Sequence, residues 1–328
     1  MADNGRMQQS GGAADGLGGA VADRPAGRSA VAKPPRADVL LMPIGILAVS
    51  TSGPLIAAAA APALAIAMWR NAFAVGAIAP YALWRSRAEL RALTGREWRW
   101  SLGAGVLLAL HFATWVPSLD YTSVASATAI VCVQPVWVAL IARRMGHDVP
   151  RRAWVGIGIA LVAVVVLTGV DFSLEPRALI GDLLALAGGV FAAFYTVAGG
   201  EVRRTVSTTA YTLVCYTACA LLLLLVCLVF RQQLTGYDDT TWLQLLALTA
   251  GAQLLGHSLF NRILRTTSAT VVSLAILFEV PGAALIAAIY LGQTPPLAAI
   301  PAAVLLLIGL AIVISARSPQ AEAAVPAE

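Results

Sequence analysis

The feature of this sequence that most restricts its fold is a succession of apolar runs. Crossing the hydrocarbon core of a bilayer takes about 20 mostly apolar residues in one helix. Ten segments meet that requirement, at residues 39–61, 63–84, 100–118, 122–142, 152–170, 178–199, 208–230, 241–261, 268–290 and 296–315. The sequence therefore predicts an all-α integral membrane protein of ten transmembrane helices.

The composition agrees with lipid as the solvent. Of the 328 residues, 59% are hydrophobic and 12% are charged, and soluble domains carry about twice that charged fraction. The net charge of +5 comes without a basic stripe or a base-stacking platform, so we expect no nucleic-acid partner. All four cysteines lie within apolar runs, which is typical of small buried hydrophobic side chains, and we expect no metal site and no cofactor.

The basic residues orient the predicted helices. With both termini in the cytoplasm, nearly all of the 22 Lys and Arg residues lie on the inner side. The outer loops hold only Arg177 and Arg231, and Arg70 lies within a span. This alternation follows the positive-inside rule. We therefore expect a multi-pass protein of the cell membrane, with residues 1–37 as a disordered cytoplasmic tail and 317–328 as a shorter one.

The chain also contains an internal repeat. One ungapped shift aligns Gly105 with Gly251, His111 with His257, Pro135 with Pro281, Gly146 with Gly292, and Pro150 with Pro296. The two halves are residues 38–171 and 178–316, each with five spans. Because five is odd, the second half enters the membrane in the opposite orientation. The sequence thus predicts two inverted five-helix repeats, an architecture that serves alternating access in secondary transporters.

Short motifs in both halves carry a family resemblance. They are Thr-Ser-Val-Ala-Ser-Ala-Thr-Ala (122–129), Gln-Pro-Val-Trp (134–137), Arg-Arg-Met-Gly (143–146), Ser-Ala-Thr-Val-Val-Ser-Leu-Ala (268–275), Glu-Val-Pro (279–281) and Tyr-Leu-Gly-Gln (290–293). With them the chain resembles the drug/metabolite transporter superfamily, specifically its EamA-type ten-helix members. The resemblance implies a secondary transporter of small organic metabolites, often an exporter. That family commonly has a Gly-Glu pair where this chain has Gly146-His147 and Gly292-Gln293, so no subfamily or substrate is carried over.

Polar stripes mark the candidate binding residues. They occupy one helical face in the third and eighth spans and flank the Gly188-Gly189 pair in the sixth. The substrate-binding candidates among them are His111, Trp115, Tyr195, Gln253, His257 and Asn261. We interpret the three stripes as the wall of a polar, aromatic cavity between the halves. The alternative is hydrogen bonding that only joins the helices, and for any single residue the sequence leaves both interpretations open.

Two ionisable residues inside the spans complete the candidate set, because charged groups at that depth are costly and usually functional. Glu279 lies near the middle of the ninth span, where a carboxyl group is expected to be largely protonated near neutral pH. We expect it either to couple transport to protons or to bind a cationic substrate group. Arg70 suits a substrate carboxylate. The structural alternative is an ion pair between Arg70 and Glu279.

Prolines and a glycine supply the candidate gate and hinges. Pro54, after Gly53, removes a backbone donor and should interrupt the first span, which would place a gate or pocket wall there. Pro135 and Pro281, at equivalent positions of the fourth and ninth spans, are candidate hinges. Static kinks that serve packing are the alternative.

Among functions, transport is favoured, with amino acids and similar small amphipathic metabolites as the expected substrates. An intramembrane enzyme would need a paired catalytic set or a nucleophile motif, and neither occurs in the sequence. A non-transporting receptor or scaffold would not require inverted halves. The seventh span, which includes Leu221 to Leu225, carries no charge and is expected to face lipid or a second copy of the chain in a homodimer.

Overall fold

The computed structural model describes residues 34–122, 124–168, 175–292 and 299–315. The predicted tail 317–328, most of the predicted tail 1–37, Gln293 and Pro296 lie outside these ranges. Within them every regular element is a helix, so the all-α prediction is confirmed for the part of the chain that the structure describes.

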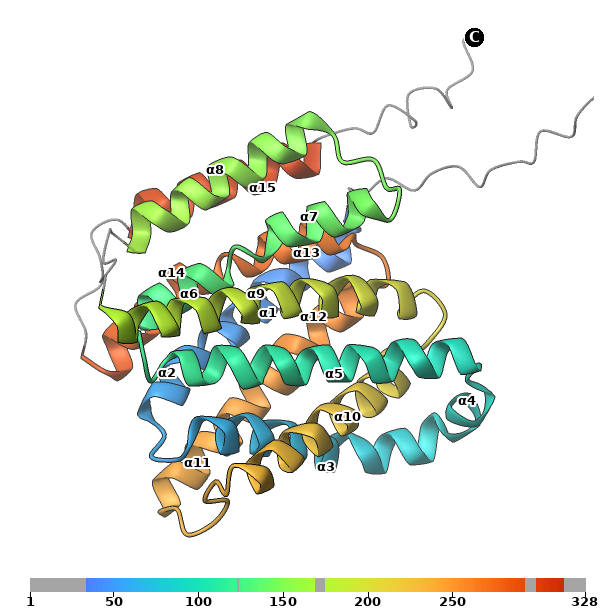
Figure 1. The fold of residues 1–328 in the computed structure, drawn as a ribbon. Coiled ribbons are helices and arrows are strands. Elements are labelled where there is room, and N and C mark those ends of the chain that lie inside the picture. The colour runs from blue at the N-terminus through green and yellow to red at the C-terminus, as the bar shows by residue number, and fades with distance from the viewer. Residues whose placement is uncertain (1–33, 123, 169–174, 293–298, 316–328) are drawn as a thin grey trace, which may run out of the picture.

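The helices fall into two series along the chain (Figure 1). The first series is α1 (Arg36–Ser50), α2 (Ser52–Ala58), α3 (Ala63–Arg85), α4 (Arg87–Ala92), α5 (Gly95–Ser118), α6 (Val124–Val131), α7 (Gln134–Arg144) and α8 (Arg151–Thr168). The second is α9 (Pro176–Val202), α10 (Thr208–Val229), α11 (Asp239–Leu248), the π-helix η1 (Thr249–His257), α12 (Ser258–Ile263), α13 (Ala269–Ile276), α14 (Glu279–Tyr290) and α15 (Ala299–Ser315).

Eight helical segments of the described residues are long and apolar enough to cross a membrane. They are Arg36–Ala58, Ala63–Arg85, Gly95–Ser118, Ala127–Arg144, Pro176–Val202, Thr208–Val229, Asp239–Ile263 and Ala269–Tyr290. These correspond to eight of the ten predicted spans. The fifth and tenth spans coincide with α8 and α15, which are not among the eight, so the count of ten stays a prediction.

Local sequence signals explain several helix ends. Thr94 and Glu97 form a capping box that begins α5, and the side chains of Ser207 and Asp238 cap α10 and α11. Gly146 follows α7 with φ +82°, and Gly292 follows α14 with φ +65°. Only glycine adopts this left-handed conformation without strain. The two glycines that the repeat aligns therefore do the same structural task at the ends of corresponding helices.

The helices pair in a symmetric manner. α5 packs along α9, and the corresponding eighth segment (α11, η1 and α12) packs against α1 and α2. α8 lies beside α15 at one edge of the bundle, and α3 packs against α10 (Figure 1). A two-fold relation between the halves would produce these pairings. The inversion of one half relative to the other stays a prediction.

Small residues allow the closest helix crossings. A Cβ added to Gly156 of α8 would lie 2.6 Å from the carbonyl oxygen of Gly309 in α15. In α9, a Cβ on Gly189 would lie 2.9 Å from the Val131 carbonyl oxygen, and one on Gly188 would lie 2.9 Å from Trp115 Cβ. These glycines therefore bring backbones together as small residues do in membrane bundles.

The seventh span, α10, is only partly the lipid-facing helix that its composition suggests. Leu221 and Leu225 are 61% and 56% exposed, which agrees with a face turned to lipid or a partner. Tyr211, Cys215 and Tyr216 are fully buried on the opposite face, and α10 packs there against α3 and α5. The sequence alone does not distinguish the two faces of α10, because the buried face is mostly apolar, like the exposed one.

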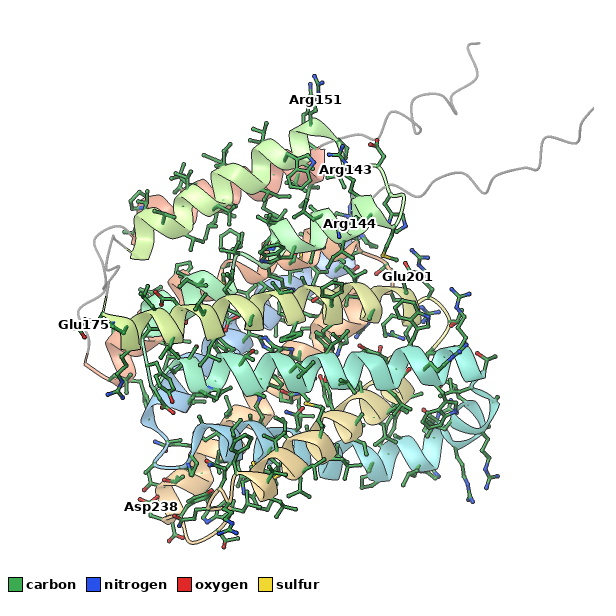
Figure 2. All side chains as sticks on the ribbon, viewed as in Figure 1. Arg143, Arg144, Arg151, Glu175, Glu201 and Asp238 are labelled. Atoms are coloured by element: carbon green, nitrogen blue, oxygen red, sulfur yellow. The ribbon has the colours of Figure 1, made fainter. Side chains whose placement is uncertain are left out.

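Charged side chains gather at the two ends of the bundle (Figure 2). Arg143, Arg144 and Arg151 lie at the end where α7 terminates and α8 begins, whereas Glu175 and Asp238 lie at the opposite end. The basic end is the one predicted to be cytoplasmic. The structure contains no membrane, so the orientation stays a prediction.

Candidate functional site

Segments from both halves enclose a cavity inside the bundle. It contains about 710 Å³ of space free of protein atoms, part of it continuous with the outside. The wall is formed by α1 and α2, α5, the α6–α7 and α13–α14 junctions, α9, and η1 with α12. Three of these six spans, the third, the sixth and the eighth, carry the polar stripes in the sequence.

Two broken spans supply the polar groups at the centre of the wall. In the fourth span α6 ends at Val131 and α7 begins at Gln134, and in the ninth α13 ends at Ile276 and α14 begins at Glu279. A proline in the first turn of each second segment has no backbone N–H to continue the preceding helix. Both breaks therefore place a new helix start, with Gln134 or Glu279, at the cavity.

The two helix starts differ in their contacts. Gln134 Nε2 donates to Thr196 Oγ1 at 2.8 Å and to the Ala192 carbonyl oxygen at 3.4 Å, both in α9. Glu279 lines the same cavity, is partly exposed to it, and has no hydrogen bond or ion pair to another described residue. The cavity thus contains an acidic group that is free to meet a ligand.

An aromatic wall faces these helix starts. His111 Nδ1 donates to the Gly188 carbonyl oxygen at 2.9 Å, and its ring stacks on Trp115 with centroids 5.7 Å apart. His257 meets Phe112 edge-on at 5.7 Å and Tyr195 at 6.4 Å. The histidines that the repeat aligns therefore belong to one aromatic cluster, which offers ring faces and a ring nitrogen to the cavity.

A hydrogen-bond network fixes the polar groups beside this wall. Tyr195 Oη donates to Asn261 Oδ1 at 2.9 Å, and Asn261 Nδ2 donates to Tyr216 Oη at 3.4 Å. Arg203 Nε donates to the Asn261 carbonyl oxygen at 2.9 Å from behind the cavity. Burial lowers the pKa of Arg203 to about 10, so this side chain stays cationic at neutral pH.

A second network lies behind Ser52, a residue of the cavity wall. Arg70 Nε donates to Gln253 Oε1 at 2.9 Å, and Arg70 Nη1 donates to Ser52 Oγ at 3.2 Å. Gln253 Nε2 in turn donates to Asn71 Oδ1 at 3.0 Å. The guanidinium carbon of Arg70 lies 4.4 Å from the centre of the Phe112 ring.

The structure brings together six of the eight substrate-binding candidates. His111, Trp115, Tyr195, His257, Asn261 and Glu279 line the cavity. Arg70 and Gln253 are fully buried and do not line it; they lie behind its wall and bond each other. Arg70 and Glu279 form no ion pair in the described part of the chain, so the structural alternative for these two residues is absent here. Their binding roles stay predictions.

The gate and hinge candidates lie at the interruptions of three spans. The first span breaks at Thr51, between α1 and α2, and Gly53 and Pro54 lie in the first turn of α2. Pro135 and Pro281 lie in the first turns of α7 and α14. All three breaks border the cavity. That these breaks act as a gate or as hinges stays a prediction.

A second hollow opens at the predicted cytoplasmic end. Between the ends of α7 and α9 and the α12–α13 connection it contains about 1360 Å³ of space free of protein atoms, open to the outside. His147, Arg204 and Arg265 lie on its wall, and Leu264 lines both this hollow and the central cavity. Leu264 is thus common to the walls of the central cavity and of the second hollow.

Several wall residues were absent from the candidates drawn from the sequence. Gln134 directly precedes Pro135, and a polar residue beside a proline in a span is a signal that could have identified it. Ser52 lies in the Ser-Thr-Ser run before Pro54, within the segment that the sequence marks as a gate or pocket wall, and it lines the cavity. Thr196 gave no such signal, because it is a common residue on a helix whose facing partner is set by packing.

Comparison with known proteins agrees with this architecture. A curated protein of Synechocystis sp., named an uncharacterized transporter, is 27% identical over 187 residues, which span 54% of this chain and 55% of that protein. The chain thus matches about half the length of this relative. A solved crystal structure has a TM-score of 0.70 at 20% identity, covering 84% of this chain and 96% of that chain, and shows that the fold is shared.

The family assignment rests on most of the chain. The model of the EamA-like transporter family matches residues 37–169 and 179–315. These two ranges contain all the described helices that line the cavity. The chain is therefore a member of the EamA-like transporter family, within the drug/metabolite transporter superfamily.

Proposed function

We propose that this membrane transporter is a secondary transporter of small organic metabolites such as amino acids. It works in the export direction, and its two halves open the central cavity to the two sides of the membrane in turn. The observation that carries the proposal is Glu279. It is an acidic residue at the start of a broken helix, inside the bundle, and it faces the cavity without a hydrogen bond or ion pair to another described residue. A buried group of this kind is costly unless it binds something during function.

The chemistry of the wall supports small amphipathic substrates. Trp115 and Tyr195 offer aromatic faces to apolar groups, whereas Asn261 and His257 offer hydrogen-bonding atoms. Glu279 can take up a proton or bind a substrate ammonium group, and these two roles compete for one carboxyl. Such competition is a direct way to couple proton movement to transport, because the substrate and the proton then occupy the site in turn.

The interruptions of the spans support alternating access. Helix breaks in membrane proteins occur where backbone groups are buried in protein or line a cavity. The breaks at Thr51, Cys132–Val133 and Leu277–Phe278 all border the central cavity. In our proposal the halves move about these positions, and the hollow beyond Leu264 is the inner route. The protein would reside in the cell membrane with both termini cytoplasmic.

The alternatives of intramembrane enzyme and non-transporting receptor or scaffold lack a comparable observation. The family membership favours transport over catalysis. Neither alternative requires a partner-free carboxyl at a cavity formed by both halves. A transporter needs both a central cavity and helices that can change their mutual arrangement.

Uptake by the purified full-length chain in proteoliposomes tests the proposal. A panel of amino acids and related metabolites is applied with and without a pH gradient across the vesicle membrane. We expect saturable uptake of at least one compound, accelerated by the gradient. Saturable uptake that ignores the gradient for every compound would reject proton coupling, and uptake no faster than in protein-free vesicles for the whole panel would reject transport of this substrate class.

A further inference from the structure

The two fully buried arginines of the described chain are bonded in different ways. Arg203 is 1% exposed, and each of its three side-chain nitrogens donates: Nε to the Asn261 carbonyl, Nη1 to the Val206 carbonyl and Nη2 to Thr208 Oγ1. Arg70 is 0% exposed, and only Nε and Nη1 donate. Its Nη2 has no hydrogen-bond partner. Every side-chain nitrogen of Arg203 therefore has a hydrogen-bond partner, whereas one nitrogen of Arg70 has none among the described residues.

Among the described residues Arg70 forms no direct ion pair, although the Glu279 carboxyl is near enough to act on its charge. Its two hydrogen-bond partners, Gln253 and Ser52, are neutral, and among the described residues no carboxylate lies within ion-pair distance. The Phe112 ring offers a cation–π contact, which offsets part of the burial. A buried cation with neutral partners and an unbonded nitrogen is unfavourable, because desolvation removes water and nothing replaces it fully. A ligand that brings an anion would complete the site.

The surroundings hold the guanidinium in a fixed orientation. Gln253 Nε2 donates to Asn71 Oδ1, so the amide oxygen of Gln253 is left to accept from Arg70. Asn71 Nδ2 donates to the Ala67 carbonyl oxygen at 2.9 Å, which anchors the amide chain to α3. These contacts fix Nε and leave the Nη1–Nη2 edge to other partners. A carboxylate binds that edge through two parallel hydrogen bonds.

Ser52 stands between this edge and the central cavity. Its Oγ accepts from Arg70 Nη1, and the residue is itself part of the cavity wall. Ser52 is the first residue of α2, directly after the break at Thr51. A serine side chain needs only rotation about one bond to release Nη1. Displacement of Ser52 would therefore leave Nη1 without its partner on the cavity side of the guanidinium.

We propose that Arg70 is the receptor for a substrate carboxylate, reached when Ser52 is displaced, and that together with Glu279 it selects small zwitterions of the α-amino acid type. This inference rests on the proposed transport function and specifies its substrate class. Glu279 receives the ammonium group, and Arg70 receives the carboxylate. The aromatic side chains of the cavity wall, which include Trp115 and Tyr195, contact the rest of the substrate.

A ligand series on the unmodified full-length chain gives the first test. The probes are the proteinogenic amino acids, their carboxamides, and the matching carboxylates without the amino group, each scored by the thermal midpoint of the protein in detergent. We expect at least one amino acid to stabilise the protein and its carboxamide to bind at least about tenfold more weakly, as happens when a polar site loses its intended partner. Equal binding of acid and carboxamide, or stabilisation by carboxylate-free probes alone, would overturn the inference.

Variants locate the effect at Arg70. Arg70→Gln should bind the best amino acid and its carboxamide equally, whereas Ser52→Ala should keep the preference for the acid and bind it more tightly, because Nη1 is then free. Arg91→Gln is the control, since Arg91 is an exposed arginine in the last turn of α4 and lines neither the central cavity nor the second hollow. A preference for the acid that persists in Arg70→Gln would reject the role of Arg70.

The outcomes separate this inference from the proposed function. Transport of a carboxylate-free metabolite, equally fast in the wild type and in Arg70→Gln, would leave the transporter proposal standing and remove the carboxylate receptor. If the wild type transported none of the probes, the proposed transport function would be rejected. Should Arg70→Gln fail to fold, Ser52→Ala still tests the role of Arg70, because only a carboxylate that binds Nη1 gains affinity when Ser52 Oγ is removed; unchanged affinity for the acid in Ser52→Ala would reject that role.

Discussion

The fourth and ninth spans are built alike and differ in one polar residue. Both consist of a short helix, a break of two residues and a second helix with a proline in its first turn. In the fourth span Gln134 is bonded to α9 through Thr196 and Ala192. In the ninth span Glu279 lines the cavity and has no hydrogen bond or ion pair to another described residue. The shared architecture delivers a helix start to the cavity twice, and only one start carries an ionisable group.

This difference suggests a division of work between the halves. A neutral amide with satisfied hydrogen bonds fixes α7 against α9 and lowers the freedom of that break. A carboxyl without partners leaves the α13–α14 break free to respond to a proton or a substrate. We infer that the fourth span is the more static of the pair and that the ninth span carries the coupling. Four predictions test this asymmetry and the packing around it.

Glu279→Gln should have the largest effect. Glutamine keeps the shape of the side chain and cannot bind or release a proton, so gradient-driven uptake should fall to the level of protein-free vesicles. Protein yield should not change, because the carboxyl has no hydrogen bond to lose. Uptake in proteoliposomes with a pH gradient measures this, with Asp239→Asn, an exposed carboxylate in the first turn of α11, as control. Normal gradient dependence in Glu279→Gln would end the coupling role.

Gly189→Ala should have the next largest effect, on stability. Its Cβ would lie 2.9 Å from the Val131 carbonyl oxygen at the end of α6, and backbone cannot move aside cheaply. Overpacking of this kind costs about 1–3 kcal/mol. The matched control is Gly200→Ala in the same helix, where nothing lies within 4 Å of the new Cβ. Thermal unfolding in detergent should separate the two variants, and equal midpoints would contradict the tight contact.

Pro281→Ala should slow transport by about tenfold, which corresponds to about 1.4 kcal/mol in the barrier. Alanine restores a backbone N–H that can bond the Leu277 carbonyl, so α13 and α14 would tend to join and Glu279 would turn from its present position. Pro135→Ala, the equivalent change in the fourth span, should slow transport less. Initial uptake rates at saturating substrate give the comparison. A larger effect at Pro135 would reverse the proposed asymmetry.

Gln134→Ala should have the smallest effect. It removes the bond to Thr196, whose hydroxyl still donates to the Ala192 carbonyl oxygen at 2.8 Å. Interhelical hydrogen bonds in membrane proteins contribute about 1 kcal/mol or less, so a modest fall in the thermal midpoint is expected. Gradient dependence of uptake should persist in this variant. Its loss would show that the two breaks share the coupling role.

Much of the architecture could be predicted from the sequence, because lipid imposes strict requirements on length and composition. The apolar runs identified the helices, and the prolines Pro54, Pro135 and Pro281 indicated three of the interruptions. Six of the eight predicted binding residues line the cavity, because polar residues inside a span have few alternatives to a cavity; their binding role stays a prediction. Glu279 could be identified because it is the acidic residue that lies deepest in a predicted span.

The positions of Arg70 and Gln253 could not be predicted in the same way. Periodicity gives the face of a helix on which a residue lies, but not the neighbour that covers it. Gln253 lies in a π-helix, η1, whose wider turn changes the facing of the side chains relative to an α-helix. It therefore bonds Arg70 behind the wall, while His257, four residues later, reaches the cavity.

By itself the sequence determined the class of the protein: helices set by apolar length, an orientation suggested by the basic residues, a repeat visible in aligned His, Pro and Gly residues, and an acidic residue in mid-span. Only the tertiary structure decided which polar groups meet. Gln134 bonds Thr196, Arg70 bonds Gln253 and Ser52, and the Glu279 carboxyl bonds no other described residue. The physical reason is that burial in lipid depends on each segment alone, whereas the satisfaction of a buried polar group depends on a neighbour that may come from any part of the chain.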